Sequence, residues 1–458
     1  MQEEQLRLTR EQKEAIGLLS IGTFLEYFDL MLYVHMAVLL NELFFPQYDP
    51  DTTSILSAMA FCSTFIFRPI GALLFGWIGD NIGRKSTIII TTTMMAISCL
   101  IMANLPTYAQ VGITASWAIT ICRIVQGMTS MGEIIGAYIY LIETIKRPMQ
   151  FPAVASITVF SAVGTTAALG VASLATVYGF NWRIAFWIGG IVAIVGVVAR
   201  TRLRETPEFV DMKKKMERAI ERESGITEAE NFLKSSDNPM KKEKVKKMTS
   251  WALFLIKCGW PVCFYISYIH CSHILKNSFG YSAEQIIHQN FIVSIIDMIG
   301  MMILPHLSYY VYPLKILKIK TFIFLPFILI SPYLLDHASS GFHILLIQSF
   351  IMFFVLENMP ATPIFYIYFP VFKRFTYVTF IYALSRAVMY VITSFGLIYL
   401  TKCFGNYGLL VIVIPVTLGF IFGIYYFEKL EKNNEALLKE SKKSFQKLFG
   451  KHKFSAVE

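Results

Sequence analysis

Twelve apolar stretches, each long enough to cross a lipid bilayer as a helix, constrain the fold of this chain more than any other feature. A helix needs about 20 mostly apolar residues to traverse the hydrocarbon core. Lipid offers no hydrogen-bond partners, so every backbone group must be paired within the protein. We therefore predict an all-α membrane protein with twelve transmembrane helices. They are expected near residues 16–44, 53–79, 86–104, 111–142, 152–177, 181–200, 250–274, 286–311, 319–335, 341–368, 376–401 and 407–427.

The composition agrees with this class of protein. Hydrophobic residues make up 55% of the chain and charged residues 16%, whereas soluble proteins carry about 25% charged residues. A net charge of +10 would suit nucleic acid, but the basic residues stand between apolar stretches, where membrane topology requires them. We expect no nucleic-acid partner. The seven cysteines are scattered, and the pair His270 and His273 lacks a third ligand, so no metal or cofactor is expected.

Lysine and arginine are concentrated on alternate connections, which predicts the orientation in the membrane. Residues 80–85 and 144–151 carry them, whereas 46–51 and 104–110 carry none. Lys315, Lys318 and Lys320 are predicted to continue this alternation on the connection after 286–311. Because cytoplasmic connections are enriched in Lys and Arg, an even number of helices places both termini in the cytoplasm. We expect a multi-pass protein of the cell inner membrane.

One long, highly charged connection over 201–249 divides the chain into two sets of six predicted helices. The expected organisation is an N-terminal bundle over 1–200, a cytoplasmic loop over 201–249 and a C-terminal bundle over 250–427. A basic cytoplasmic tail over 428–458 follows. A layout of two six-helix halves is typical of secondary transporters. We expect a monomer whose partners are a small-molecule solute and the bilayer.

Several ionisable residues fall inside the predicted helices. A charge at the bilayer centre costs about 2.5–3.5 kcal/mol, so these side chains are expected to face the bundle interior, pair with one another or line water. They are Glu26, Asp29, Arg68, Arg123, Glu133, Lys257, Asp297, Glu357 and Arg386.

Their spacing defines candidate sites. Glu26 and Asp29 share a helix face, and burial beside a like charge favours the protonated form of one of them. Arg123 would oppose this, so we hypothesise that protonation and an Arg–carboxylate contact alternate during proton-coupled transport. The positions from Arg123 to Glu133 form one polar stripe. The candidates for solute binding or proton coupling are Glu26, Asp29, Arg123, Gln126, Glu133, Lys257 and Glu357.

The segment "GWIGDNIGRK" (76–85) resembles the signature of the Major Facilitator Superfamily between its second and third helices, apart from Asn81, where Arg or Lys is usual. The resemblance implies a fold of two six-helix bundles and a cytoplasmic gate. Asp80 would contact the start of a helix in the other half, where the helix dipole favours an anion. Arg84 would pair with Glu143. The gate residues implied are Gly76, Asp80, Gly83, Arg84, Lys85 and Glu143.

Further segments are similar to the metabolite:H⁺ symporter branch of that family, which contains proline/betaine transporters and permeases for α-ketoglutarate, citrate and shikimate. They include "GTFLEYFDLMLY" (22–33), "RIVQGMTSMGEIIGAYIYLIE" (123–143) and "RLRETPEF" (202–209). The second half is less similar. "HLSYYVYPLK" (306–315) lacks the acidic residue and glycine of a second gate motif.

The resemblance implies a proton-coupled symporter, not an enzyme, that imports a small osmolyte such as proline or glycine betaine by alternating access. Arg123 or Lys257 would hold a solute carboxylate, and Tyr27, Phe28 and Tyr33 would face a quaternary ammonium group. The alternative is a symporter of a small carboxylate such as α-ketoglutarate or citrate, which more than one buried cation in the cavity would favour. A solute sensor that does not transport is a third reading.

Overall fold

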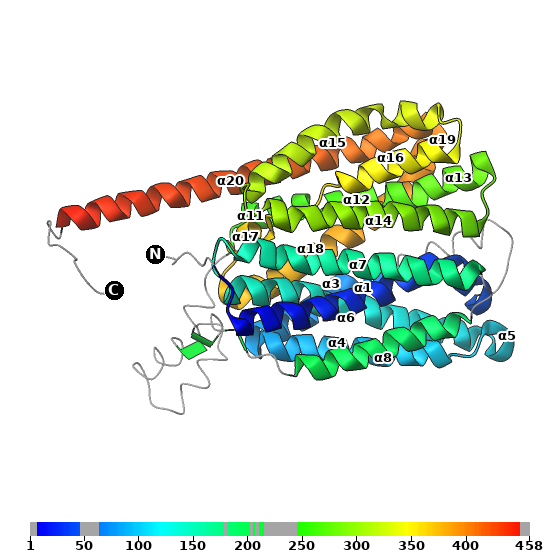
Figure 1. Ribbon diagram of the computed structural model, residues 1–458, viewed down its shortest axis with the longest axis horizontal. Helices are drawn as coiled ribbons and strands as arrows, with labels where there is room; N and C mark the ends of the chain where they lie inside the picture. Colours follow the sequence, from blue (N-terminus) through cyan, green and yellow to red (C-terminus); the bar gives the residue numbers. More distant parts are fainter. Residues whose placement is uncertain are drawn as a thin grey trace.

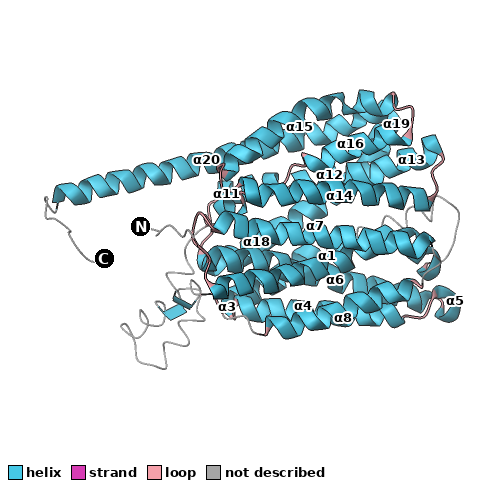
Figure 2. Ribbon diagram, in the orientation of Figure 1, coloured by secondary structure: helices cyan, strands magenta, loops and turns pink. Residues whose placement is uncertain are grey.

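The computed structural model describes residues 7–45, 64–177, 181–201, 205–206, 210–211, 213–214 and 245–448. Helices joined by short loops make up this part of the chain (Figure 2). Residues 53–63 of one predicted helix, most of the predicted loop 201–249 and residues 449–458 of the predicted tail lie outside the described residues.

Within its described residues, the first half forms six helices of 14 residues or more and one short helix. Gly83 separates the second and third long helices with φ of 145°, a backbone conformation that costs glycine little and other residues much. The elements are α1 (Arg10–Phe44), α3 (Arg68–Asn81), α4 (Arg84–Asn104), α5 (Tyr108–Val111), α6 (Ile113–Thr144), α7 (Gln150–Val177) and α8 (Trp182–Arg200).

The second half forms six rods, three of which are interrupted. The first is α11 (Lys247–Lys257), α12 (Gly259–Phe264), the π-helix η1 (Tyr265–His270) and α13 (Cys271–Phe279). Next are α14 (Ala283–Leu307), α15 (Pro313–Asp336), α16 (Gly341–Phe353) and α17 (Thr362–Tyr366). The last are α18 (Val371–Val391), η2 (Ile392–Gly396), α19 (Leu397–Phe404), η3 (Gly405–Tyr407) and α20 (Gly408–Leu448). Together the two halves confirm the predicted fold class of twelve membrane helices in two bundles.

Six described stretches are long and apolar enough to span a membrane by their own length and hydropathy. They are Arg10–Leu32, Arg84–Asn104, Gln150–Leu174, Lys247–Phe279, Glu284–Leu307 and Val371–Asn434. The helices α3 and α16 have 14 and 13 residues and are shorter than a bilayer crossing.

The two halves meet along two pairs of helices. In Figure 1 the rods lie roughly side by side, with α7 and α18 between the remaining helices of the two halves. The helix α3 packs against α18, and α7 packs against α14. A Cβ atom on Gly76 would lie 2.7 Å from the Cα atom of Thr376, so only glycine lets α3 approach α18 this closely. The helix α1 begins, and the end of α20 protrudes, at one end of the bundle, which we call the motif end because residues 80–85 lie there.

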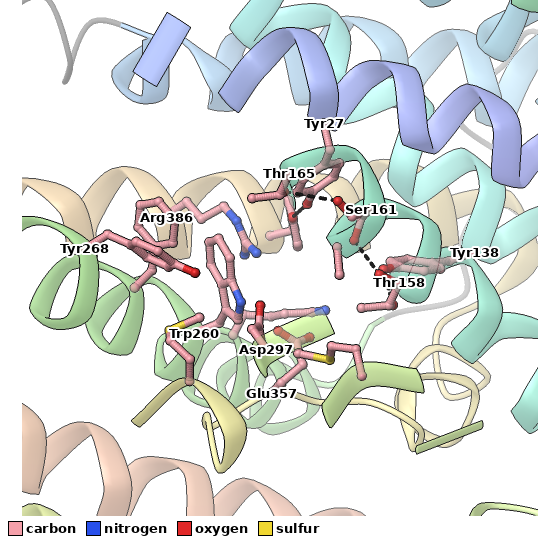
Figure 3. A pocket seen from close by; sticks show the side chains of 16 residues that line it. Tyr27, Tyr138, Thr158, Ser161, Thr165, Trp260, Tyr268, Asp297, Glu357 and Arg386 are labelled. Atoms are coloured by element: carbon pink, nitrogen blue, oxygen red, sulfur yellow. Dashed lines mark hydrogen bonds between the residues drawn. The ribbon is translucent and has the colours of Figure 1, made fainter. Parts of the chain in front are cut away.

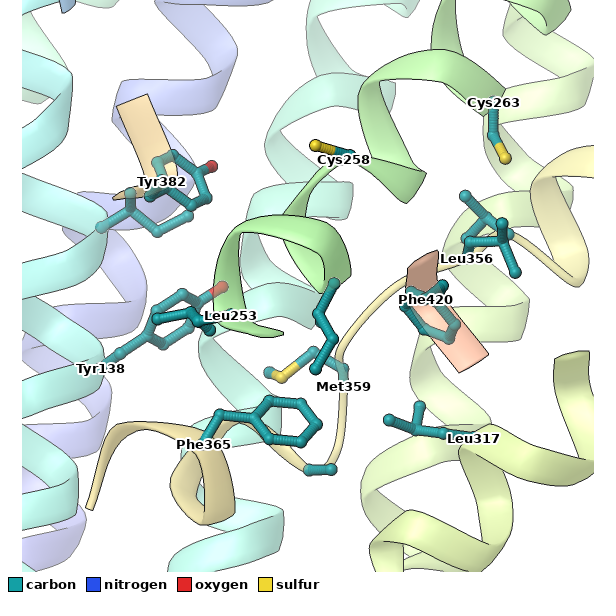
Figure 4. Packing of buried hydrophobic residues seen from close by; sticks show 14 of the residues in the cluster. Tyr138, Leu253, Cys258, Cys263, Leu317, Leu356, Met359, Phe365, Tyr382 and Phe420 are labelled. Carbon is teal, nitrogen blue, oxygen red and sulfur yellow. The ribbon is translucent and has the colours of Figure 1, made fainter. Parts of the chain in front are cut away.

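The predicted continuous helix over 341–368 is wrong in its middle. After α16 ends at Phe353, residues 354–361 leave the helix, and α17 begins at Thr362. Pro360 has no N–H to donate and Pro363 restricts the residue before it, which breaks the helix here. Irregular backbone at membrane depth is tolerated only where protein or a water-filled cavity surrounds it. Leu356 and Met359 of this break are buried, among side chains such as Leu253 and Leu317 (Figure 4).

Candidate functional site

Asp80 joins the two halves at the motif end. Its carboxylate, in the last turn of α3, accepts hydrogen bonds from the backbone N–H groups of Phe375 (3.1 Å) and Thr376 (2.8 Å) near the start of α18. A helix N-terminus carries a partial positive charge that favours an anion. The contact expected of Asp80 with a helix start in the other half is therefore present in the structure.

Arg84 and Glu143 are fully buried beside Asp80. The Nε and Nη2 groups of Arg84 donate to the two carboxylate oxygens of Glu143 at 3.2 and 3.1 Å, and Nη1 lies 3.2 Å from Asp80. Arg84 Nη2 also donates to the carbonyl of Val371 in the other half (2.8 Å). Arg374 of α18 donates to Glu143 at 3.1 Å. We call Asp80, Arg84, Glu143 and Arg374 the gate cluster.

Sequence reasoning missed two residues that complete this cluster. Glu205 accepts hydrogen bonds from the backbone N–H groups of Arg84 (3.0 Å) and Lys85 (3.4 Å) and so caps the start of α4. Thr206 donates through Oγ1 to Glu143 at 2.8 Å. A Cβ atom on Gly83 would lie 2.1 Å from Glu205. The signal was the segment "RLRETPEF", whose acid and threonine follow the last helix of the first half.

A second set of contacts crosses between the halves at the motif end. Glu431, in the part of α20 beyond the apolar run, accepts from Arg147 (2.8 Å), Tyr312 (3.0 Å) and Tyr368 (2.8 Å). Arg147 belongs to the first half and follows α6. We call these four residues the tail cluster. Of the four residues, Tyr312 belongs to the segment 306–315, where a second gate motif was expected, and it acts there as a hydrogen-bond donor to Glu431.

The predicted polar stripe of α6 faces other helices of its own half. Gln126 Nε2 donates to Asp29 at 2.5 Å, and Arg123 Nη1 donates to Gln126 Oε1 at 3.1 Å, so Gln126 stands between Asp29 and Arg123. Glu133 accepts from Thr92 Oγ1 at 3.0 Å. Glu26 is also buried. None of these five predicted site residues lines the central pocket, because α6 turns the stripe toward α1 and α4.

The pocket lies between the two halves. The first half contributes Tyr27 of α1, Tyr138 of α6 and small or hydroxyl side chains of α7, including Ser161 and Thr165. The second half contributes aromatic and charged groups, which Figure 3 shows pointing into the same space. They are Lys257, Trp260, Phe264, Tyr268, Asp297, Glu357, Tyr382 and Arg386. The free volume is about 40 Å³, which admits water and not an amino-acid-sized solute.

Two cations line this pocket. Lys257 Nζ donates to Asn358 Oδ1 at 2.9 Å and lies 5.1 Å from the ring centre of Tyr382. The guanidinium carbon of Arg386 lies 3.7 Å from the ring centre of Tyr382 and 5.0 Å from that of Trp260. Arg386 Nη1 has no hydrogen-bond partner among the described residues.

Two carboxylates face the cations. Asp297 and Glu357 line the pocket, and Asp297 Oδ1 has no hydrogen-bond partner in the described part of the chain. Of the predicted site residues, the structure therefore brings Lys257 and Glu357 to the pocket. Asp297 and Arg386 were recognised as buried charges in the sequence but were not predicted as site residues. Their position on the pocket face depends on helix rotation, which a lone charge does not reveal.

Lys320 corrects a prediction about topology. It was expected on a connection, but α15 begins at Pro313, so Lys320 lies two turns inside a helix. There it interacts electrostatically with Asp297 and Glu357. The apolar residues that alternate with the lysines of 315–320 were the missed signal, because they give this segment the pattern of a helix.

These features define the class of protein: a polytopic helical membrane protein whose two bundles enclose a charged pocket. The model of the Major Facilitator Superfamily matches residues 19–394, and the chain belongs to this family. The family consists of transport proteins, which separates the chain from enzymes.

Two curated relatives illustrate the similarity. The chain is 33% identical to "Proline/betaine transporter" of Salmonella typhimurium over 212 residues. This matched stretch covers 45% of this chain and 42% of the relative. It is 35% identical over 202 residues to "Inner membrane metabolite transport protein YhjE" of Escherichia coli, covering 42% and 46%. The chain thus spans under half the length of the curated relatives it matches.

Solved structures share the fold at low identity. A proton:xylose symporter, XylE, bound to 6-bromo-6-deoxy-D-glucose matches with a TM-score of 0.72 and 15% identity, over 91% of this chain and 95% of XylE. The inward open conformation of XylE from E. coli matches with a TM-score of 0.61 and 16% identity, over 91% and 96%.

Proposed function

We propose that this protein is a secondary transporter of the inner membrane that imports a small zwitterionic solute together with protons by alternating access. Proline and glycine betaine are the preferred solutes. The observation that carries this proposal is that a donor, Arg386 Nη1, and an acceptor, Asp297 Oδ1, line the same pocket and each lacks a hydrogen-bond partner in the described part of the chain. Buried polar groups without partners are costly, and a solute with a carboxylate and a cationic group satisfies both.

Arg386 is suited to hold the solute carboxylate. A guanidinium binds a carboxylate through two parallel hydrogen bonds, and stacking on Tyr382 and Trp260 fixes its plane. The cationic end of the solute then meets Asp297 and Glu357. Aromatic rings support an alkylated ammonium group. Of the three aromatics proposed for this role, Tyr27 lines the pocket and donates or accepts a hydrogen bond with Tyr382 (3.2 Å). Phe28 is buried elsewhere, and the side chain of Tyr33 lies outside the described residues.

Alternating access follows from the contacts at the motif end, which we assign to the cytoplasmic side with both termini. The gate and tail clusters hold the two halves together there. The contracted pocket is too small for the solute, so solute must enter after the halves separate at the opposite end. Release to the cytoplasm requires the interbundle contacts of Asp80, Glu143 and Glu431 to break.

The second candidate is a symporter of a small carboxylate. Lys257 and Arg386 both line the pocket, and two carboxylates on one solute would use two cations. The zwitterion remains the preferred solute because the carboxylate of Glu357 stands in the same pocket and would repel a second solute carboxylate.

The test is uptake into proteoliposomes that contain the purified full chain. Radiolabelled proline, glycine betaine, α-ketoglutarate and citrate are offered singly, with and without an imposed inward proton gradient. We expect proline or betaine to accumulate and accumulation to rise with the gradient. Uptake of dicarboxylates alone would replace the zwitterion by the second candidate. No uptake of any solute above protein-free liposomes, by protein shown to be folded, would contradict transport of these solutes.

A further inference from the structure

Four charged groups of the second half face one another without contact. Lys257 of α11, Asp297 of α14, Lys320 of α15 and Glu357 of the 354–361 break interact electrostatically. As far as the described residues show, no two of opposite sign lie within the 4.0 Å of an ion pair. We call them the acid–base cluster. Asp297 and Glu357 also line the pocket, so the cluster opens onto the proposed solute site.

The helix break keeps this cluster together. Residues 354–361 are not helical. Glu357 can therefore line the pocket while its neighbour Asn358 contacts Lys257, although a continuous helix would point two successive side chains in different directions. Lys257 is held at Asn358 (2.9 Å), and Asn358 donates in turn to Thr362. Lys257 therefore has a neutral partner, which leaves the carboxylate of Glu357 without a direct cationic contact. Discontinuous helices of this kind form ion and solute sites in many transporters.

Asp297 is the member of the cluster with a buried polar atom that has no hydrogen-bond partner among the described residues. The residue is half-buried in the second half, and its buried Oδ1 atom accepts no hydrogen bond from the described residues. The titratable and charged groups around it are Lys320 of α15, Glu357 of the break and Tyr268 of η1. The helix α7, which packs on α14, presents hydroxyl groups such as Ser161 and Thr165. Lys257 and Arg386 complete the pocket wall.

A carboxylate in this environment has two routes to neutrality. It takes up a proton and becomes a carboxylic acid, or it forms an ion pair with Lys320. When Asp297 is protonated, Lys320 is attracted to the carboxylate of Glu357 and no longer to Asp297. When the proton leaves, the attraction between Lys320 and Asp297 returns. Burial without a partner favours the protonated route. Asp29 of the first half also has an oxygen without a partner among the described residues, Oδ1, but its Oδ2 accepts from Gln126, which in turn accepts from Arg123.

We infer that Asp297, with Lys320 and Glu357 as positioning residues, is the proton-binding site that couples solute movement to the proton gradient. The inference rests on the proposed function and moves coupling from Glu26 and Asp29 to the second half. A proton from the outer medium binds one carboxyl oxygen of Asp297 while the solute occupies the pocket, where Glu357 supplies the negative charge that faces the cationic end of the solute. The same proton leaves to the cytoplasm after the halves reorient. One zwitterion and one proton then carry one net positive charge across the membrane.

The first experiment detects the proton without any solute. Infrared difference spectra of the purified full chain in proteoliposomes, recorded as the pH is changed, should show the carbonyl band of a protonated carboxylic acid. We expect the Asp297→Asn variant to lose this band and the Asp29→Asn variant to keep it. Persistence of the full band in Asp297→Asn, or its loss in Asp29→Asn, would overturn the assignment. The amide is isosteric, and Asn should fold; near-wild-type thermal unfolding confirms this.

The second experiment separates coupling from transport. Asp297→Asn should lose accumulation driven by an imposed proton gradient, because the amide binds no proton. Exchange of labelled for unlabelled solute at equal pH should persist with a raised KM, because Asp297 also lines the solute pocket. Lys320→Gln serves as the second variant and should weaken coupling while exchange persists. Gradient-driven accumulation at the wild-type level in Asp297→Asn refutes the inference and leaves the proposed transport intact. If the wild type moves no solute, the proposed function fails, and the infrared result still decides whether Asp297 binds the proton.

Discussion

The gate cluster makes a quantitative prediction about Asp80. In the Asp80→Asn variant the side chain keeps one oxygen but loses its charge, so one of the two hydrogen bonds from Phe375 and Thr376 is lost and the other is weakened. Hydrogen bonds to charged groups contribute about 1.5–3 kcal/mol, and an anion at a helix N-terminus contributes about 0.3–2 kcal/mol. Since both contacts exist only while the halves touch, we expect the closed motif end to lose about 2–3 kcal/mol relative to the open one. At 1.4 kcal/mol per factor of ten, this shifts the closed-to-open ratio roughly 30- to 150-fold.

The assay is a distance measurement between the halves by electron paramagnetic resonance. Spin labels on Ile82→Cys and Tyr310→Cys, which are 55% and 77% exposed, report on the two halves at the motif end, with the native cysteines replaced. Asp80→Asn should move the distance distribution toward the longer, open component. The matched control is Asp336→Asn, which changes an exposed acid at the other end, where it accepts from Asn406. An unchanged distribution in Asp80→Asn, or an equal shift in Asp336→Asn, would refute the reasoning.

Two further predictions concern close approach and solute binding. Gly76→Ala places a Cβ atom 2.7 Å from the Thr376 backbone and should disfavour the closed motif end by about 1–3 kcal/mol. The same distance measurement detects this change, and a wild-type distance distribution would contradict the prediction. The control is Gly17→Ala, because the space around Gly17 is open. Arg386→Lys removes the planar guanidinium group, which binds a carboxylate through two hydrogen bonds. The variant should raise KM for the transported solute by about tenfold or more, with a smaller change in kcat. An unchanged KM in initial-rate uptake measurements would show that Arg386 does not bind the solute.

Local patterns explain why the sequence predicted the fold and the motif contacts. Apolar runs of bilayer length lead to helices because backbone pairing leaves no other choice. The contacts of Asp80 and Arg84 were predicted because the short segment 76–85 resembles a known family motif, although their partners Glu143, Phe375 and Thr376 lie 59 to 296 positions away. Glu143 could be predicted because it lies at the end of the helix that packs beside them.

Helix rotation and long-range partners explain what the sequence did not predict. The stripe from Arg123 to Glu133 is polar whichever neighbour it faces, and only the placement of α1 and α4 shows that it points into its own half. Lys320 looked like part of a cytoplasmic connection because three lysines within 315–320 outweighed the apolar residues between them, which mark the helix that begins at Pro313. The break at 354–361 was hidden by apolar composition, although Pro360 and Pro363 were its sign. The tail cluster joins residues up to 284 positions apart, such as Arg147 and Glu431.

The central claim is that one pocket between the two halves is reached from either side of the membrane in turn. The most direct test uses the substitution Thr165→Cys in a variant whose native cysteines have been replaced. Thr165 lines the pocket from α7. A membrane-impermeant thiol reagent is applied from each side of oriented vesicles. We expect labelling from the side opposite the motif end in the wild type, added labelling from the motif end in Asp80→Asn, and protection by the transported solute. A cysteine that reacts from neither side, or from only one side in both proteins, would contradict it.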